Sequence, residues 1–293
     1  MIRIEERRAK KLPGITNLFV SFDFNMKTLE TLRELPNRHY DKNTKEWEIP
    51  LSKLEHLVKE IDDDFEIVPL IEQETALQSI PNNYVFKTKP YPHQIEGVEY
   101  GLNNDTWILG DEQGLGKTKQ IIDLASILKQ EGKIKHCLII CGVNSLKWNW
   151  FNEVHTHSNE QAYILGTRYR VNGKKIIGSL QDRIDDLKKL SDESPLFIVT
   201  NIETFRDETF KDTLKKINSI DMAVIDEAHK VKNPTSEQGK NILKLTHFKY
   251  KIAMTGTLIM NNPLDAYTAL KWLGIEKSNY STFKNYYCVY GGF

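Results

Sequence analysis

The sequence predicts an α/β protein in which a doubly wound, mainly parallel sheet follows a small α+β domain. Two observations predict the sheet. At residues 107–125 an apolar stretch, a glycine-containing loop and the start of a helix follow one another, and at residues 223–227 a second apolar stretch ends in two carboxylates. A third observation, strand and helix patterns alternating over residues 17–69, predicts the small domain. With 293 residues, one large or two modest domains are expected.

The overall composition excludes several classes of protein. The chain has 40 basic and 40 acidic residues, so any site for a polyanion must come from a local patch of charge. Its three cysteines, Cys137, Cys141 and Cys288, form no C-x-x-C pair, which favours reduced thiols over disulfides or zinc. The amino terminus lacks an apolar signal region, and no apolar run reaches membrane-spanning length. We therefore expect a soluble, intracellular protein without a membrane partner, cytoplasmic if it is prokaryotic or viral.

The small domain is expected over residues 1–70. Apolar residues alternate along residues 18–24, which predicts a strand whose buried face carries Leu18, Val20, Phe22 and Phe24. A helix (26–35), a hairpin (38–49), a second helix (51–61) and a last strand (65–68) follow, so that the predicted order is β-α-β-β-α-β. The polar, proline-interrupted residues 71–90 predict a linker, and residues 91–293 are expected to form the parallel-sheet lobe.

The loop after the apolar residues Trp107–Leu109 has the features of a phosphate-binding loop. Gly114 and Gly116 allow backbone N–H groups to close on a polyphosphate at the start of a helix. Lys117 would then contact the β- and γ-phosphates of a nucleotide, and the Thr118 hydroxyl would coordinate Mg²⁺. The alternative is a glycine-rich turn that binds no nucleotide.

A pair of acidic residues provides the second half of the predicted site. The apolar residues Ala223–Ile225 predict a strand, and Asp226 and Glu227 stand at its carboxyl end, where a doubly wound sheet places its chemistry. Asp226 would hold Mg²⁺ through water, and Glu227 would orient and deprotonate the attacking water. The alternative is a solvated acidic turn. Together the two patterns predict a nucleoside triphosphatase, although Asp111 replaces the first glycine of G-x-x-x-x-G-K-[ST].

Residues 168–177 predict a basic β-hairpin. An Asn-Gly turn at residues 172–173 separates two short strand patterns, and from residue 166 to residue 178 the chain has basic residues but no acidic one. The four basic residues are Arg168, Arg170, Lys174 and Lys175. Such a ribbon could contact the backbone of duplex DNA or act at a junction. The alternative is a solvated hairpin whose charges only maintain solubility.

Five elements in order along the chain resemble those of the SWI/SNF-type DNA translocases, which are superfamily 2 helicase-like ATPases. The matching segments are Tyr91–Val98, Asp111–Thr118, Ser145–Glu153, Asp226–Asn233 with its Asp-Glu-Ala-His (DEAH) box, and Thr255–Asn262. The family's own loop, Asp-Glu-x-Gly-Leu-Gly-Lys-Thr, accounts for Asp111. Val143 and Leu258 stand where the family usually has proline. The resemblance implies a RecA-like P-loop lobe that uses ATP and Mg²⁺ and binds duplex or branched DNA through its backbone.

The same resemblance implies roles for residues outside the triphosphate site. These are adenine recognition by Gln94, contacts with the phosphates of the tracked strand by Ser145, Lys147, Thr200 and Asn201, and coupling of hydrolysis to that strand by His229, Thr255 and Thr257. It also implies a second RecA-like lobe that supplies arginines to the transferring phosphoryl group, and no room for it remains before Phe293. Because loss of such an arginine costs about 10³- to 10⁵-fold in rate, we expect a truncated protein that binds ATP but hydrolyses it poorly.

The segment Tyr40–Trp47 carries a second resemblance. Its sequence, Tyr-Asp-Lys-Asn-Thr-Lys-Glu-Trp, resembles the signature of the HARP domain found beside the motor of annealing helicases. The resemblance implies a module that recognises branched DNA or single-to-double-strand junctions. The alternative is that Tyr40 and Trp47 only fill the core of an accessory domain.

The sequence therefore predicts the ATP-binding part of a DNA-dependent ATPase that remodels or reanneals duplex or branched DNA. Two alternatives remain open. An RNA helicase of the DEAH class would be stimulated by RNA rather than by DNA. A non-catalytic nucleotide- or DNA-binding module would tolerate the replacement of Lys117 by alanine.

Overall fold

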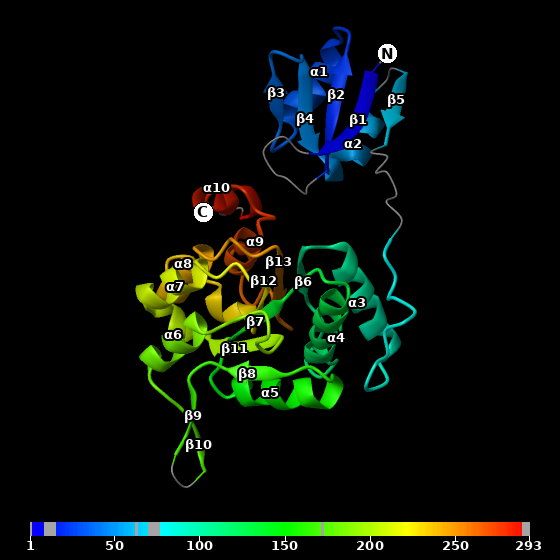
Figure 1. The fold of residues 1–293 in the computed structure, drawn as a ribbon. Helices are drawn as coiled ribbons and strands as arrows, with labels where there is room; N and C mark the ends of the chain where they lie inside the picture. Colours follow the sequence, from blue (N-terminus) through cyan, green and yellow to red (C-terminus); the bar gives the residue numbers. More distant parts are fainter. Residues whose placement is uncertain (1, 9–15, 62–63, 70–76, 171–172, 289–293) are drawn as a thin grey trace. The chain divides into compact units, whose positions relative to one another are not determined.

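The computed structural model describes residues 2–8, 16–61, 64–69, 77–170 and 173–288 (Figure 1). The chain divides into two compact units, one of residues 1–75 with 275–293 and one of residues 76–274. The second unit contains the parallel sheet that was expected within residues 91–293. Its carboxyl boundary differs from the predicted one, because residues 275–288 group with the first unit and residues 289–293 lie outside the described part.

The small domain is built on a five-stranded sheet in the order β3-β4-β2-β1-β5. Its elements are β1 (Ile2–Arg8), β2 (Thr16–Phe22), α1 (Met26–Glu34), β3 (His39–Asp41), β4 (Glu46–Pro50), α2 (Leu54–Glu60) and β5 (Phe65–Val68), and the same unit contains α10 (Tyr280–Tyr287). Ile4 and Leu18 from the sheet pack with Leu32 of α1 and Leu57 of α2 in one core. The two helices therefore cover one face of the sheet through the apolar residues that predicted them.

The strand β1 was not predicted, and it changes the topology of the small domain. β1 pairs antiparallel with β2 and parallel with β5, so the order is β-β-α-β-β-α-β. Only Ile2 and Ile4 mark it as a strand, because charged residues surround them in the sequence. Both isoleucines are buried, at 1% and 0% exposed. The predicted burial of Phe24 is wrong, since β2 ends at Phe22 and the Phe24 side chain is 80% exposed.

Tyr40 and Trp47 face each other across the β3–β4 hairpin. Their ring centroids lie 5.0 Å apart, Trp47 packs against the core of the small domain, and Tyr40 is 41% exposed. Packing accounts for Trp47 but leaves much of Tyr40 in solvent. The HARP resemblance itself stays a prediction.

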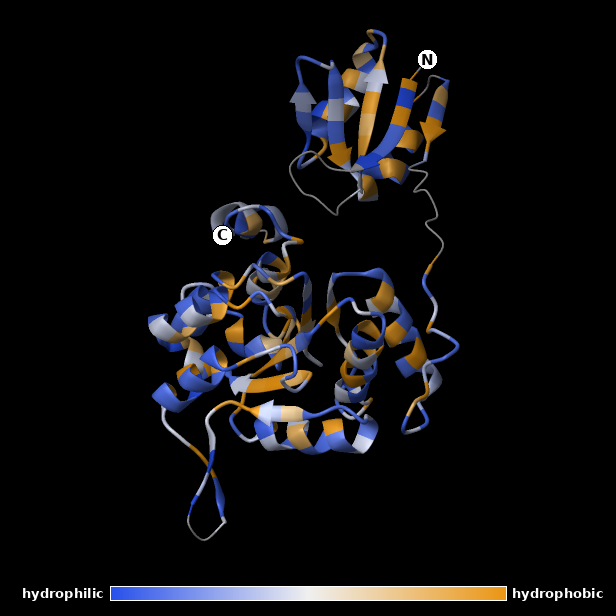
Figure 2. Ribbon diagram, in the orientation of Figure 1, coloured by the Kyte–Doolittle hydropathy of each residue, from blue (hydrophilic) through white to orange (hydrophobic). Residues whose placement is uncertain are grey.

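The lobe contains a six-stranded sheet in the order β6-β13-β12-β7-β11-β8, and every pairing in it is parallel. Its strands are β6 (Thr106–Leu109), β7 (His136–Cys141), β8 (Ala162–Ile164), β11 (Phe197–Asn201), β12 (Ile220–Asp226) and β13 (Tyr250–Met254). Figure 2 shows that these strands are mostly hydrophobic, as expected for a sheet covered on both faces. The predicted doubly wound α/β fold is confirmed.

Helices cover both faces of this sheet. They are α3 (Pro92–Asn103), α4 (Lys117–Gln130), α5 (Leu146–His157), α6 (Leu180–Lys188), α7 (Glu208–Lys215), α8 (Glu237–Leu243) and α9 (Tyr267–Leu273). Alternate residues of β7 enter two separate cores. Cys137 and Ile139 pack with α3, α4 and α5, whereas Leu138 and Ile140 pack with α6 to α9. Among the described residues no helix has the length and apolar character needed to cross a bilayer.

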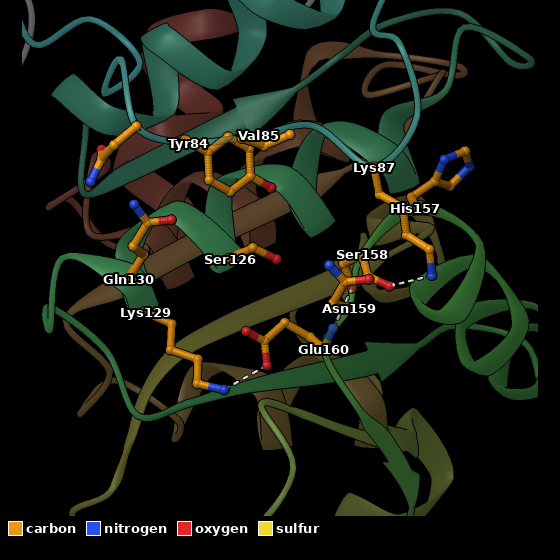
Figure 3. A pocket seen from close by; sticks show the side chains of 11 residues that line it. Tyr84, Val85, Lys87, Ser126, Lys129, Gln130, His157, Ser158, Asn159 and Glu160 are labelled. Atoms are coloured by element: carbon orange, nitrogen blue, oxygen red, sulfur yellow. Dashed lines mark hydrogen bonds and ion pairs between the residues drawn. The ribbon is translucent and has the colours of Figure 1, made fainter.

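Residues 77–90 pack against the lobe, although the sequence predicted a linker there. Ile80 and Tyr84 contact the core beneath α3 and α4, and the Tyr84 hydroxyl donates to Asp123 Oδ1 at 3.3 Å. Lys87 Nζ donates to the carbonyl oxygens of His155 and Ser158 at 2.6 and 2.9 Å. This segment, α4 and the end of α5 surround a cavity of about 450 Å³ (Figure 3). Residues 70–76, the remainder of the predicted linker, lie outside the described part.

The predicted hairpin is present between β8 and α6. β9 (Thr167–Tyr169) pairs antiparallel with β10 (Lys175–Ile177), and Arg170 N donates to Lys174 O at 3.0 Å. Gly173 has a φ of +77°, which favours glycine. The predicted Asn172 of the turn lies outside the described residues.

Candidate nucleotide-binding site

The loop after β6 has the backbone that a phosphate-binding loop requires. Gly114 and Gly116 have φ angles of +88° and +77°, in the left-handed region that favours glycine. A Cβ atom on Gly116 would lie only 2.2 Å from Gln94 Nε2, so a larger residue there would require the Gln94 side chain to move. α4 begins directly afterwards at Lys117, and its first backbone N–H groups have no partners within the helix. A helix start of this kind has the geometry that binds an anion such as phosphate.

Lys117 is held by its own loop. Its Nζ atom donates to the backbone oxygens of Asp111 and Glu112, at 2.7 and 3.0 Å. Both acceptors are neutral carbonyl groups, which bind an ammonium less strongly than a charged phosphate oxygen does. A triphosphate can therefore displace them as partners of Lys117.

The predicted triphosphate residues surround one space at the carboxyl edge of the sheet. Asp226 is opposite Cys141 and Met254 in the strand register, which places it beside the loop that follows β6. A cavity of about 390 Å³ is lined by Gly114, Gly116, Lys117, Thr118, Asp226 and Glu227, together with residues of α5. An adjacent cavity of about 420 Å³ is lined by Lys117, Glu227, His229, Gly256 and Thr257. Residues far apart in the sequence thus meet at one edge.

Asp226 is a buried carboxylate that accepts a hydrogen bond from Trp150. It is 9% exposed, and its Oδ2 atom accepts a hydrogen bond of 2.8 Å from Trp150 Nε1. Burial raises the pKa of Asp226 above its ordinary value, an effect that the Trp150 hydrogen bond opposes and the neighbouring Glu227 reinforces. Trp150 is not among the site residues that the sequence predicted. The rule that a buried indole N–H needs an acceptor could have indicated this role.

Glu227 has an unusual backbone conformation. Its φ is +57°, which is rare for a residue with a side chain and tends to cluster at functional sites. Its Oε2 atom lies 3.1 Å from His229 Nδ1, which in turn lies 3.3 Å from Thr255 Oγ1. The Thr255 hydroxyl also accepts a hydrogen bond of 3.1 Å from Thr257 N. The predicted coupling residues therefore form a continuous chain of contacts that starts at Glu227.

The residues at the cavity fit a Mg²⁺ ion. Mg²⁺ prefers oxygen ligands, and the Thr118 hydroxyl and the Asp226 carboxylate supply them. Burial raises the pKa of Asp226, and the nearby Lys117 offsets that effect only in part, so the ionised carboxylate would gain from further positive charge. A bound cation would supply that charge.

Asp226→Asn is expected to raise the melting temperature of the ligand-free protein. Because the pKa of Asp226 is raised from its ordinary value of 3.8, stability is lost as pH rises from that value through the raised pKa, and the loss persists at neutral pH. An amide avoids this loss and can still accept the Trp150 hydrogen bond. Each 1 kcal/mol recovered corresponds to about 2–4 °C in a domain of this size. Thermal denaturation at neutral pH, with the exposed Glu237→Gln as control, checks this; an unchanged or lower melting temperature would contradict it.

Gln94 joins α3 to the phosphate loop. Its Oε1 atom accepts from Tyr91 N, and its Nε2 atom donates to Leu115 O, both at 3.1 Å. The side chain is buried, so both ends of its amide are used within the protein. Adenine recognition by Gln94 would require an exchange of these partners and stays a prediction.

Of the predicted phosphate-contacting residues, Thr200 and Asn201 end β11, whereas Ser145 and Lys147 lie at the start of α5. Ser145 is exposed, whereas Thr200 and Asn201 are 1% and 2% exposed. The Thr200 hydroxyl donates to Thr204 Oγ1 at 3.2 Å, and the Thr204 hydroxyl donates to Asn201 Oδ1 at 2.8 Å. In this arrangement Thr200 and Asn201 position Thr204 and do not themselves face solvent.

Lys147 and Arg183 bring two positive charges to the same region. Burial, and then the nearby Arg183, lower the pKa of Lys147; burial also lowers the pKa of Arg183. Arg183 Nη1 donates to Thr204 Oγ1 at 3.0 Å, but Arg183 Nε is buried without a hydrogen-bond partner in the described part of the chain. Arg183 was missed because it belongs to no recognised element and lies within the mixed charge of α6.

Of the four basic residues of the hairpin, which were predicted to contact nucleic acid, Arg168 forms ion pairs within the protein instead. Its Nε atom lies 3.0 Å from Asp182 Oδ1, and its Nη1 atom lies 3.0 Å from Asp186 Oδ2. Both carboxylates belong to α6, so Arg168 fastens the hairpin to the lobe. The side chains of Arg170, Lys174 and Lys175 are exposed.

The chain is similar to a known family over most of the lobe. Residues 93–289 match the family described as the SNF2-related domain. The chain is 30% identical over 187 residues to the probable ATP-dependent DNA helicase CHR12 of Arabidopsis thaliana, covering 62% of this chain and 16% of that protein. It is 29% identical over 187 residues to the ISWI chromatin-remodeling complex ATPase ISW1 of Saccharomyces cerevisiae, covering 62% and 15%. The chain thus spans about a sixth of the length of these relatives.

A solved structure extends the likeness to three dimensions. The Sulfolobus solfataricus SWI2/SNF2 ATPase core in complex with dsDNA has a TM-score of 0.56 and 27% sequence identity with this chain, over 71% of this chain and 41% of the other. The family match over residues 93–289 includes the phosphate loop and the acidic pair. The chain belongs to the SNF2-related domain family.

Proposed function

We propose that the chain is the ATP-binding lobe of a DNA-dependent ATPase that moves along duplex or branched DNA and remodels or reanneals it. The observation that carries this proposal is the gathering of Lys117, Thr118, Asp226 and Glu227 around one cavity. An ammonium, a hydroxyl and two carboxylates in this order along a parallel sheet are the groups that P-loop triphosphatases need. The relatives' names and the dsDNA in the similar structure support DNA as the partner.

The proposed chemistry assigns each group one task. Lys117 leaves the carbonyls of its loop and contacts the β- and γ-phosphates, while the first N–H groups of α4 bind the same anion. Thr118 and Asp226 would hold Mg²⁺, which neutralises charge on the phosphates. Glu227 orients the attacking water and accepts its proton. A movement of the Glu227 side chain would be transmitted to Thr257 through the contacts of His229 and Thr255.

A second lobe would complete this site in the proposed mechanism. Enzymes of this kind stabilise the charge on the transferring phosphoryl group with arginine side chains. The residues described around the cavity include one lysine, Lys117, and no arginine. We therefore propose that a second RecA-like lobe contributes the missing guanidinium group.

The DNA backbone is proposed to bind where Lys147 and Arg183 meet. Burial lowers the pKa of both side chains, and the nearby Glu203 opposes this effect only in part. Among the described residues, Arg183 Nε is buried without a hydrogen-bond partner. A phosphate group supplies both the charge and the acceptor. Thr204 holds Arg183 in place through a hydrogen bond. Because Thr200 and Asn201 are hydrogen-bonded to Thr204, we propose that they support DNA binding only indirectly.

Lys147→Met is expected to weaken binding of duplex DNA and to reduce its salt dependence. Methionine keeps the buried stem of the side chain, so the fold is preserved. Loss of one phosphate contact lowers the slope of log K against log salt by about 0.9, and Lys147→Met with Arg183→Met lowers it by about 1.8. The measurement is fluorescence anisotropy with a labelled duplex at several salt concentrations.

Lys188→Ala provides a matched control, because this exposed lysine of α6 makes no contact in the proposed site. Unchanged slopes in both methionine variants would remove the DNA backbone from this region. A duplex RNA of the same sequence tests the alternative of an RNA helicase, since stronger binding and greater ATPase stimulation by RNA would favour it.

A further inference from the structure

The β9–β10 hairpin projects from the lobe beyond β8, the strand at one edge of the sheet (Figure 1). Neither strand carries an acidic residue, and the same holds for the sequence from residue 166 to residue 178. The mechanism proposed above makes no use of it. A short ribbon without a core of its own gains little stability by itself, so its presence requires another explanation.

The base of the hairpin is firmly held. Besides its two ion pairs with α6, Arg168 donates from Nη2 to the carbonyl of Asp182 at 3.1 Å. Asp186 Oδ2 also accepts from Gly166 N at 2.7 Å and from the Tyr163 hydroxyl at 2.8 Å. These charge-assisted hydrogen bonds fix the direction in which the hairpin leaves the lobe. A hairpin that only aided solubility would not need a fixed direction.

The exposed part of the hairpin combines an aromatic ring with cations. Tyr169 is 65% exposed, and Lys175 Nζ lies 5.8 Å from the centre of its ring. The same amine lies 4.9 Å from the ring centre of Phe151 on α5, so it is positioned between the two rings. Arg170 and Lys174 are exposed beside them. A large aromatic ring left in solvent among positive charges is a common feature of single-stranded nucleic-acid sites.

We propose that this hairpin binds the unpaired strand at a junction between single-stranded and duplex DNA, with Tyr169 stacked on an unpaired base. Contact with duplex backbone would need the cations alone, because bases within a duplex are stacked on one another and offer no free face. An unpaired base has a free face for Tyr169, and its phosphates fit Arg170, Lys174 and Lys175. This inference rests on the proposed function, since it presumes that the lobe binds DNA, and it names branched DNA as the preferred substrate.

The test compares one forked DNA with a fully paired duplex of the same duplex length, by fluorescence anisotropy. Tyr169→Ala is expected to weaken fork binding about 5- to 150-fold, which corresponds to the loss of one base–aromatic stack. Binding of the paired duplex should stay within about twofold of the parent protein, as expected for a surface substitution away from that contact. Tyr169→Phe keeps the ring and should retain fork binding.

A second measurement shows which base of the DNA Tyr169 contacts. With 2-aminopurine as the first unpaired base of the fork, the parent protein should change the fluorescence of that base on binding, and Tyr169→Ala should not. Lys188→Ala with Lys189→Ala serves as a control for exposed positive charge on α6. Melting temperatures of all variants verify that the lobe remains folded.

The outcomes separate this inference from the proposed function. Equal losses on fork and duplex, or no loss on either, would overturn the junction contact while leaving ATP and duplex binding intact. Failure of the parent protein to bind any of the DNAs would contradict the proposed function itself.

Discussion

Glu227→Gln is expected to lower the rate of ATP hydrolysis about 10²- to 10⁴-fold, the usual contribution of a positioned general base. Glutamine has nearly the same shape and can still bond to His229, which lies 3.1 Å from the carboxylate. It cannot accept a proton from water. Since the proposed ATP site uses Lys117 and the start of α4, the affinity for ATP should remain close to that of the parent protein.

The rate is to be measured in the full-length protein with duplex DNA present, and the affinity by titration with a fluorescent ATP analogue. Glu237→Gln makes the same chemical change on an exposed position of α8 and should have no effect. A Glu227→Gln protein that hydrolyses ATP within twofold of the parent rate would show that Glu227 does not act on the water.

Lys117→Ala is expected to weaken binding of Mg–ATP about 10- to 150-fold, because a hydrogen bond to a charged group contributes about 1.5–3 kcal/mol. In the ligand-free protein the same substitution frees two carbonyls, those of Asp111 and Glu112, that lie in an open loop and can bond to water. Its effect on the melting temperature should therefore be small. Calorimetric titration with Mg²⁺ and a non-hydrolysable analogue measures the affinity.

The control for this variant is Lys129→Ala, also on α4, whose Nζ atom pairs with Glu160 and lies outside both cavities of the nucleotide site. Equal affinities of the Lys117→Ala and Lys129→Ala proteins for the analogue would mean that the loop does not bind a triphosphate. In that case the alternative, a glycine-rich turn that binds no nucleotide, would be the better interpretation.

The parallel sheet and the triphosphate residues were predictable because their signals are local. The apolar stretch Ala223–Ile225 is buried on both faces, as a central parallel strand must be, and the acidic pair follows it directly. Lys117 and Thr118 follow the glycines of the loop in the same way. Parallel pairing then brings the two segments to one edge, a consequence of topology that needs no further information.

The features that sequence reasoning missed depend on partners far away in the chain. β1 was missed because its strand character comes from pairing on both sides, with β2 and β5, rather than from its charged sequence. The contact of Trp150 was missed because its acceptor, Asp226, lies 76 residues further along the chain. Arg168 was grouped with the other hairpin cations because the sequence does not show which of them faces the carboxylates of α6.

The structure of this protein with Mg²⁺ and a non-hydrolysable ATP analogue would test the central claim most directly. We predict that Lys117 Nζ leaves the carbonyls of Asp111 and Glu112 and bonds to the phosphates, while Thr118 and Asp226 lie at the metal and Glu227 faces the γ-phosphate. If the cavity stays empty at millimolar analogue, or the analogue binds elsewhere with Lys117 still on its loop, these four side chains do not form a nucleotide site.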